Sequence, residues 1–291
     1  MKVAIIGSSG QLGSDLVRAF GEHDIVAWKR SDFDVRDHER AKEVIVTARP
    51  DVVINTAAFH RTDACEEKPE IAFAVNAIAV RNLARACEAC GASLVQISTD
   101  YVFDGEKGEA YTEDDCPRPI NVYGVTKLAG ELLTAEICTR HHIVRVASLF
   151  GVARGSGKGG NFVETMLAKA SRGEVATVVD DVRMSPTYAY DAAVAILRLV
   201  EVGAPPGVYH LTNQGSCTWY EFAQEILQQA EIPARVQPTS IAAMALTARR
   251  PRNSALYSLR LPSIGLMLLR PWTEALAAYL RRRRLQSHAT A

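Results

Sequence analysis

Near its start the chain reads Lys2-Val3-Ala4-Ile5-Ile6-Gly7-Ser8-Ser9-Gly10-Gln11-Leu12-Gly13, an apolar run followed by three glycines at intervals of three. The apolar run predicts a buried strand, and a helical pattern begins at Gly10. Between them, Gly7 permits a tight turn, Gly10 lets the backbone approach a pyrophosphate, and Gly13 lets the helix pack close to the strand. The helix start adds unpaired N–H groups and a partial positive charge. This stretch predicts the phosphate-binding turn of a dinucleotide site.

Apolar strands and amphipathic helices alternate through the first half of the chain. Strands are predicted at 2–6, 24–28, 51–54, 93–97 and 142–146, and helices at 10–20, 37–48, 69–89 and 122–136. This alternation is typical of a parallel sheet covered by helices on both faces, because the crossovers are right-handed. We therefore predict an α/β fold, a doubly wound parallel Rossmann sheet with a smaller α/β substrate-binding lobe.

The alternation becomes looser after residue 147. Residues 1–147 are expected to form the NAD(P)-binding Rossmann domain, and 148–280 mainly a substrate-binding lobe that is interleaved with it. Elements of the second part are expected at 161–172, 175–179, 190–201, 208–211, 218–230 and 273–280. The glycine-rich stretch 151–160 is expected to be a mobile loop. Residues 281–291 are expected to be a flexible basic tail, solvated rather than bound to a nucleic acid or a membrane.

The composition argues against several classes of protein. The 291 residues include 33 basic and 33 acidic side chains, so there is no excess positive charge to bind a nucleic acid. No apolar run reaches the roughly 18–20 residues that cross a bilayer, and the opening apolar run is too short for a signal peptide. Six scattered cysteines favour free thiols in a reducing compartment. We expect a cytoplasmic protein without nucleic-acid or membrane partners. Cys87 and Cys90 have no second pair or nearby histidine, so we interpret them as helix-packing residues rather than metal ligands.

The second strand ends in Trp28-Lys29-Arg30-Ser31-Asp32, where the adenosine end of a dinucleotide is recognised. Lys29 or Arg30 suits a 2′-phosphate and favours NADPH, whereas Asp32 suits the free ribose hydroxyl of NADH. We expect NADPH, with NADH as the alternative. Asp34 and Val35 follow, and they are expected near the adenine. The third strand ends in Asn55-Thr56-Ala57-Ala58-Phe59, whose small residues let the chain pass beside the cofactor.

Tyr123 and Lys127 are four positions apart on a predicted helix and therefore share a face. An ammonium near a phenol stabilises the phenolate and lowers its pKa toward the operating range. Thr99 stands at the carboxyl end of the fourth strand, the edge at which open α/β sheets bind ligands. It is expected to orient a substrate carbonyl beside Tyr123. Asp100 and Tyr101 come next, as groups that bind sugar hydroxyls or stabilise the turn.

Together these residues resemble the extended short-chain dehydrogenases/reductases, and four stretches resemble the dTDP-4-dehydrorhamnose reductase family more narrowly. The four stretches are 98–105, 111–114, 119–131 and 250–254. The resemblance covers nearly the whole chain, most firmly residues 1–147. It implies the NAD(P)H-dependent reduction of the C4 ketone of dTDP-4-dehydro-6-deoxy-L-mannose to dTDP-L-rhamnose, with hydride from the nicotinamide.

The resemblance also implies roles for individual residues. Tyr123 would donate the proton, Lys127 would tune that phenol and hold the nicotinamide ribose, and Thr99 would orient the carbonyl. Cofactor contacts are expected from Gly7, Gly10, Gln11, Leu12, Gly13, Arg30, Asp34, Val35, Ala57, Ala58, Phe59, Tyr123 and Lys127. Substrate contacts are expected from Thr99, Asp100, Tyr101, Tyr123, Asn161 and Arg250, with Lys158 as a weaker candidate.

The sequence departs from the family pattern at two places. The family often carries Trp shortly after its fifth strand, where this chain has Ser148, so the sugar pocket is either wider or shaped for another deoxysugar. After Pro186-Thr187 some members carry an acidic residue that is linked to a magnesium-bridged dimer. Here the stretch is Tyr188-Ala189-Tyr190, so we predict no such metal. We expect a monomer, or a homodimer formed through another contact.

Two alternative functions fit parts of the sequence. The β subunit of methionine adenosyltransferase resembles the same family, including Arg250-Pro251-Arg252-Asn253, so a non-catalytic NADP-binding regulatory subunit is one alternative. A reductase or epimerase of another nucleotide sugar is the other. Dehydratases usually have an Asp-Glu pair after the catalytic Thr, whereas Thr99 is followed by Asp100-Tyr101. The intact set of Thr99, Tyr123 and Lys127 favours a reductase.

Overall fold

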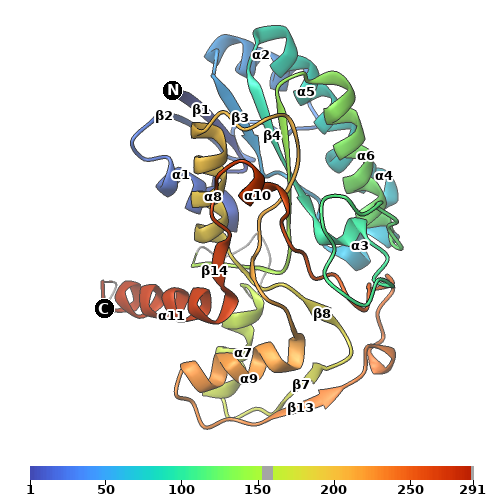
Figure 1. Ribbon diagram of the computed structural model, residues 1–291, viewed down its shortest axis with the longest axis vertical. Helices are drawn as coiled ribbons and strands as arrows, with labels where there is room; N and C mark the ends of the chain where they lie inside the picture. The colour runs from blue at the N-terminus through green and yellow to red at the C-terminus, as the bar shows by residue number, and fades with distance from the viewer. Residues whose placement is uncertain (153–159, 290–291) are drawn as a thin grey trace.

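The computed structural model describes residues 1–152 and 160–289, with side chains as far as residue 285. Within this part of the chain the main feature is a parallel sheet of six strands in the order β10-β5-β4-β3-β1-β2 (Figure 1). Its strands are β1 (Lys2–Ile6), β2 (Asp24–Trp28), β3 (Val52–Asn55), β4 (Ser93–Thr99), β5 (His141–Val146) and β10 (Gly207–His210). The chain leaves β1 in both directions along the sheet, first to β2 and then to β3. The predicted fold class, a doubly wound parallel sheet, is confirmed.

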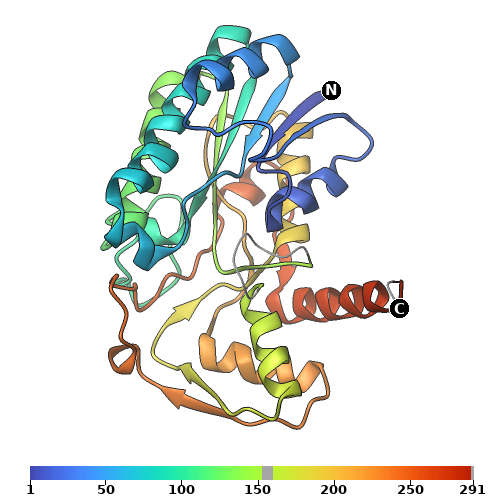
Figure 2. The ribbon, with the colours of Figure 1, turned by 180° about the vertical axis from the view of Figure 1, so that it is seen from behind.

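Helices cover both faces of this sheet (Figures 1 and 2). One face is covered by α1 (Gln11–Ala19) and α8 (Ala189–Glu201), and the other by α2 (His38–Ala48), α5 (Ala79–Cys90) and α6 (Val122–Ile137). Successive residues of β1 alternate between the two cores, with Ile5 in one and Ala4 in the other. Because both faces are buried, the strands need continuous apolar runs rather than alternating ones. This is the reason that short continuous apolar runs, rather than a period of two, located them in the sequence.

Residues beyond 147 contribute to two layers. β10 and α8 complete and cover the sheet, although they come late in the chain. A smaller layer, at the bottom of Figure 1, is made of α7 (Phe162–Ser171), α9 (Trp219–Gln229), α11 (Trp272–Ala289), β7 (Ala176–Val179) and β13 (Val236–Thr239). Its core is aromatic: the Phe150 ring lies 5.6 Å from that of Phe222 and 5.4 Å from that of Tyr279. We call this smaller layer the second lobe.

The remaining elements are short, and several of them pair segments that are far apart in sequence. They are α3 (Thr62–Glu67), α4 (Pro69–Phe73), the π-helical η1 (Ala74–Ile78), the 3-10 turns η2 (Asp100–Val102) and η3 (Ile241–Ala243), α10 (Arg260–Ser263), β6 (Leu149–Phe150), β8 (Arg183–Met184), β9 (Thr187–Tyr188), β11 (Asn213–Gln214), β12 (Cys217–Thr218) and β14 (Leu269–Pro271). β6 pairs with β9, β8 with β12, and β11 with β14. No helix of the described residues is both long and apolar enough to cross a membrane.

Two predicted segments differ from the structure. The single helix expected at 69–89 is divided into α4, η1 and α5, since residues 74–78 widen into a π-helical turn. A flexible tail was expected from residue 281, whereas α11 continues through residue 289. Arg283 Nε donates to Glu164 Oε1 of α7 at 2.6 Å, which ties this part of the helix to the second lobe. Residues 153–159 of the expected mobile loop, Lys158 included, lie outside the described residues.

Candidate active site

The glycine turn joins β1 to α1 and is closed by β2. The N–H groups of Gly7 and Ser8 both donate to the carbonyl of Trp28, at 2.9 and 3.0 Å. Gly7 has a φ of +81°, a conformation that side chains with a Cβ rarely adopt. A Cβ on Gly13 would lie 2.2 Å from the Gly7 carbonyl oxygen. The turn and the close packing of the helix therefore require glycine at these two positions.

The amino end of α1 is open to an anion. Its N-cap residue Gly10 provides no side-chain capping bond, and the first turn holds no acidic residue. The first N–H groups of a helix have no partner within the helix, and a phosphate satisfies them. The local structure thus fits the pyrophosphate of a dinucleotide.

The residues expected at the adenosine end follow β2. Arg30 has an exposed side chain, and its Nη2 lies 3.9 Å from Asp34 Oδ2. Arg36, which the sequence analysis did not consider, binds the same carboxylate through Nε at 3.0 Å and Nη2 at 2.6 Å. Its hydrogen bonds lower the pKa of Asp34 to about 2. Val35 is buried beside them. A negative charge at Asp34 is therefore already balanced, while Arg30 projects into solvent.

The loop 57–59 after β3 is held by Asn76 of η1. The Asn76 amide accepts from the Phe59 N–H and donates to the Phe59 carbonyl, both at 2.9 Å, and it also donates to Thr126 Oγ1 of α6 at 3.0 Å. The loop is thereby fixed against the helix that carries the predicted catalytic residues. The sequence analysis missed Asn76, because a polar residue inside a predicted helix gives no signal of its own.

Thr99, Tyr123 and Lys127 meet at the carboxyl end of β4. Asn121 is the N-cap of α6 and its side chain accepts from the Gly124 N–H at 2.8 Å, which places Tyr123 in the first turn. Thr99 lies close enough to Tyr123 to lower the pKa of its phenol. One turn further along α6, Lys127 Nζ donates to the Ile97 carbonyl at 2.6 Å. The three side chains that the sequence analysis grouped do lie together.

Burial dominates the electrostatics of these groups. Desolvation raises the pKa of Tyr123 well above its ordinary value, and the interaction with Thr99 only partly opposes it. The pKa of this phenol is therefore raised, not lowered as the sequence analysis expected, because burial outweighs the interaction with Thr99. Burial lowers the pKa of Lys127 to about 8, with Glu131 opposing the shift. At neutral pH, Tyr123 is a protonated acid and Lys127 is largely charged.

Asp100 and Tyr101 form the η2 turn that supports Thr99. The Thr99 hydroxyl donates to Asp100 Oδ1 at 2.9 Å and accepts from the Tyr101 N–H at 3.2 Å. Burial raises the pKa of Asp100 to about 6, while hydrogen bonds from Ser254 and Thr99 oppose the shift. The Tyr101 ring meets the Tyr123 ring edge-on, 6.0 Å between centroids. Both residues thus orient the two hydroxyls of the site.

The candidate substrate residues of the second half of the chain are both engaged by the protein. Arg250 Nη2 donates to Asp63 Oδ2 of α3 at 3.0 Å, and the Arg250 charge acts on Tyr101, so this arginine lies near the catalytic residues. Asn161 caps α7, where its Oδ1 accepts from the Glu164 N–H at 3.1 Å and its Nδ2 donates to the Gly151 carbonyl at 2.7 Å. Both the oxygen and the nitrogen of the Asn161 amide are thus hydrogen-bonded within the protein.

Two further features bear on the chemistry. Ser148, where the family often has Trp, is the second residue after β5 and adopts a φ of +42°. A serine there leaves more room than an indole. Among the described residues, no group of three or more His, Cys, Asp or Glu side chains is placed to hold a metal.

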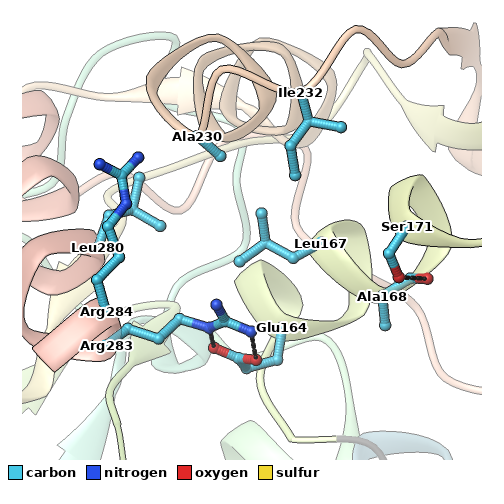
Figure 3. A pocket seen from close by; sticks show the side chains of 9 residues that line it. All are labelled: Glu164, Leu167, Ala168, Ser171, Ala230, Ile232, Leu280, Arg283 and Arg284. Carbon is cyan, nitrogen blue, oxygen red and sulfur yellow. Dashed lines mark hydrogen bonds and ion pairs between the residues drawn. The ribbon is translucent and has the colours of Figure 1, made fainter. Parts of the chain in front are cut away.

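A cavity of about 350 Å³ lies elsewhere, between α7, the end of α9 and α11 (Figure 3). Its apolar lining includes Leu167, Ile232 and Leu280, and the Glu164–Arg283 ion pair runs along one side. Thr99, Tyr123 and Lys127 are not among its lining residues. The candidate site is therefore defined by the glycine turn and the end of β4, not by this cavity.

A doubly wound sheet with a glycine turn after β1, and with Thr99, Tyr123 and Lys127 at the end of β4, defines an extended short-chain dehydrogenase/reductase. The model of the RmlD substrate binding domain matches residues 1–285. The chain therefore belongs to the dTDP-4-dehydrorhamnose reductase family.

Individual relatives agree with this assignment. The chain is 39% identical over 280 residues to a dTDP-4-dehydrorhamnose reductase of Streptomyces griseus, covering 94% of this chain and 90% of that protein. It is 37% identical over 283 residues to a probable dTDP-4,6-dihydroxy-2-methyloxan-3-one 4-ketoreductase of Streptomyces antibioticus, covering 95% and 93%. A crystal structure of dTDP-4-dehydrorhamnose reductase from Bacillus anthracis in complex with NADP matches with a TM-score of 0.92 and 36% identity, covering 97% and 99%.

Proposed function

We propose that this protein is a dTDP-4-dehydrorhamnose reductase, which uses NADPH to reduce the C4 ketone of dTDP-4-dehydro-6-deoxy-L-mannose to dTDP-L-rhamnose. The observation that carries the proposal is that Thr99, Tyr123 and Lys127 meet at the carboxyl end of β4, with Tyr123 and Lys127 one turn apart on α6. These are the groups that a carbonyl reduction needs at the end of a dinucleotide-binding sheet. The names of the relatives support the same reaction.

In this mechanism the protein positions the ketone and supplies a proton. The Thr99 and Tyr123 hydroxyls both bind the C4 carbonyl oxygen, and Tyr123 donates its proton to that oxygen as the C–O bond is reduced. The raised pKa of Tyr123 keeps the phenol in its acid form before the transfer. The bound nicotinamide supplies the hydride. Lys127 holds the nicotinamide ribose and stabilises the phenolate left after proton transfer.

The cofactor would be held along the edge formed by β1, β2 and β3. The glycine turn, with Gln11 and Leu12 at the start of α1, would bind the pyrophosphate. Arg30 would pair with the 2′-phosphate of NADPH, because it is exposed while Asp34 is already bound by Arg36. Val35 would contact the adenine, and the loop 57–59 would line the ribose side. NADH remains the alternative cofactor.

The substrate would lie between this edge and the part of the chain after residue 147. Asp100 and Tyr101 would contact the sugar side, and Arg250 the diphosphate, after exchanging part of its pairing with Asp63. Asn161 is retained only as a weaker contact, since its amide caps α7. Ser148 leaves room for a deoxysugar other than the rhamnose precursor, and the named 4-ketoreductase of Streptomyces antibioticus favours this second candidate substrate.

We further infer a cytoplasmic enzyme that acts as a monomer or homodimer without a bridging metal. The six cysteines are all unpaired, which suits a reducing compartment. The regulatory-subunit alternative is not favoured, because the similar proteins carry reductase names.

The test is the oxidation of NADPH or NADH by the purified protein in the presence of dTDP-4-dehydrorhamnose and related 4-keto-6-deoxysugar nucleotides. The proposal expects faster turnover with NADPH and with the rhamnose precursor. Turnover of another keto sugar alone would support the Ser148 alternative. No oxidation with any of these substrates, together with tight NADP binding, would favour the regulatory subunit.

A further inference from the structure

A buried ion pair lies behind the catalytic lysine. Glu131, one turn after Lys127 on α6, accepts from Arg145 of β5 through Nε at 3.0 Å and Nη2 at 2.7 Å. Both side chains are only 4% exposed. Buried ion pairs are often no more stabilising than apolar residues of similar size, so stability alone does not account for this pair. Its location next to the site suggests another role.

Glu131 and Lys127 reach neighbouring residues of the same strand. Lys127 Nζ donates to the Ile97 carbonyl at 2.6 Å, and the Ser98 hydroxyl donates to Glu131 Oε1. Residues four apart on a helix lie on one face, so the ammonium and the carboxylate both face the end of β4. The next residue of this strand is Thr99, which contacts Tyr123.

Arg145 is itself fixed on two more sides. Its Nη1 donates to Nε2 of His210 at 3.4 Å, and Nδ1 of His210 lies 3.1 Å from the Tyr257 carbonyl. A carbonyl only accepts, so the proton of this ring is on Nδ1. Burial lowers the pKa of His210 to about 4, which keeps the ring neutral. The guanidinium also lies over the Phe103 ring, 5.1 Å from its centroid. The Glu131 carboxylate therefore has one well-defined orientation.

We propose that Glu131 is a positioning residue, which keeps Lys127 charged and seated over the end of β4, and that Arg145 limits the negative charge that Lys127 experiences. The inference rests on the proposed function, since it concerns the lysine of that site. Its electrostatic part has a direction: Glu131 is the charge that opposes the lowering of the Lys127 pKa by burial.

The other charged or titratable groups around Lys127 come from separate elements. Tyr123 lies on α6, Asp100 on the η2 turn, and His60 on the loop after β3. The charge of Lys127 contributes to lowering the pKa of His60. These three side chains stay in place when Glu131 or Arg145 is substituted, whereas Arg145→Gln also removes the guanidinium beside His210.

The test reads the Lys127 pKa directly in the full-length protein without substrate or cofactor. Lysine labelled with carbon-13 at the ε position is followed by NMR through a pH titration, and the Lys127 signal is assigned by its loss in Lys127→Arg. Glu131→Gln leaves Arg145 without its carboxylate, so the Lys127 pKa should fall by about one pH unit or more. Arg145→Gln leaves the carboxylate unbalanced, so the Lys127 pKa should rise.

Opposite displacements in the two variants support the proposal. Unchanged values, or displacements in the same direction, would overturn it, because a purely structural role has no reason to reverse sign. If one single variant does not fold, the remaining one must still move in its stated direction. The double variant, Glu131→Gln with Arg145→Gln, removes both charges and should place the Lys127 pKa between the two singles; a value outside that interval also contradicts the proposal.

Activity provides a separate readout. The alkaline limb of the kcat/KM profile should move to lower pH in Glu131→Gln and to higher pH in Arg145→Gln. If no reductase activity is found in the wild-type protein, the proposed function fails while the NMR titration still decides the role of Glu131. If turnover is normal but the Lys127 pKa does not respond, the positioning role fails and the reductase assignment stands.

Discussion

Two asparagines begin helices in different halves of the molecule, and only one of the two helices carries predicted catalytic residues. Asn121 caps α6 at the Gly124 N–H and donates to the Arg249 carbonyl at 2.9 Å. Asn161 caps α7 at the Glu164 N–H and donates to the Gly151 carbonyl at 2.7 Å. The local chemistry is the same. α6 holds Tyr123 against β4, whereas α7 packs in the aromatic core of the second lobe.

The comparison shows when a polar residue in a sequence predicts function. Tyr123 became a strong candidate because a second residue at a fixed spacing, and a third at the end of a predicted strand, were expected at the same edge of the sheet. Asn161 had no such companions, and its residue type is also the one that helix starts prefer. The structure brings the three companions together and gives the isolated asparagine a capping role.

The largest expected effect is that of removing the Tyr123 hydroxyl. Tyr123→Phe should lower kcat by about 10²–10⁴-fold, because the proton donor is lost, while the Kd for NADPH changes little. Tyr220→Phe is the matched control: it removes a hydroxyl of α9 that accepts from Gln224 at 3.1 Å. Steady-state kinetics and fluorescence titration measure both quantities. Near-normal turnover in Tyr123→Phe would contradict the proton-donor assignment.

The difference between local sequence patterns and contacts between distant segments also decides how much of the structure the sequence could predict. The sheet strands were predicted within one or two residues because each is a short apolar run followed by a turn, as in Lys2–Ile6 and Asp24–Trp28. The pairs β6–β9, β8–β12 and β11–β14 were not predicted, since each is about two residues long and joins distant segments. For the same reason, the sequence did not predict that Asp63 pairs with Arg250 or that Arg145 pairs with Glu131. Such pairs depend on tertiary proximity, which no local pattern encodes.

A smaller but still large effect is expected in the glycine turn. Gly13→Ala places a Cβ 2.2 Å from the Gly7 carbonyl oxygen. Relieving this overlap must displace α1 from the turn, so NADPH binding should weaken by about 10- to 100-fold. The control is Gly21→Ala, whose nearest contact for an added Cβ is 3.3 Å from the Arg18 carbonyl oxygen. Equal NADPH affinities for the two variants, measured by titration, would contradict the role of the turn.

A third substitution tests whether the protein recognises the 2′-phosphate of NADPH. Arg30→Ala should weaken NADPH binding by about 10-fold and NADH binding much less, because only NADPH has a 2′-phosphate to pair with the guanidinium. Stability should hardly change, since the ion pair with Asp34 is exposed and long at 3.9 Å. Arg172→Ala, which removes an exposed arginine of the second lobe, is the control. Equal losses of affinity for both nucleotides would count against the 2′-phosphate contact.

The smallest expected effects are those of substituting the two asparagines that cap α6 and α7. Asn161→Ala and Asn121→Ala should each lower the free energy of unfolding by about 1 kcal/mol, which is the usual value of an N-cap. Only Asn121→Ala should also lower kcat, because α6 positions Tyr123 and Lys127. Thermal denaturation and steady-state kinetics of the two variants make the comparison. A fall in kcat/KM for Asn161→Ala at unchanged stability would instead restore Asn161 as a substrate contact.

The most direct test of the proposed reductase reaction follows the hydrogen atom that is transferred from NADPH to C4 of the sugar. The protein is given dTDP-4-dehydrorhamnose and NADPH that carries deuterium at the transferable position of the nicotinamide, and the sugar product is analysed by NMR. The account predicts that deuterium appears at C4 of the sugar, and that Tyr123→Phe slows its appearance by about 10²–10⁴-fold without changing its position. A product without deuterium at C4, or transfer at the wild-type rate in Tyr123→Phe, would contradict it.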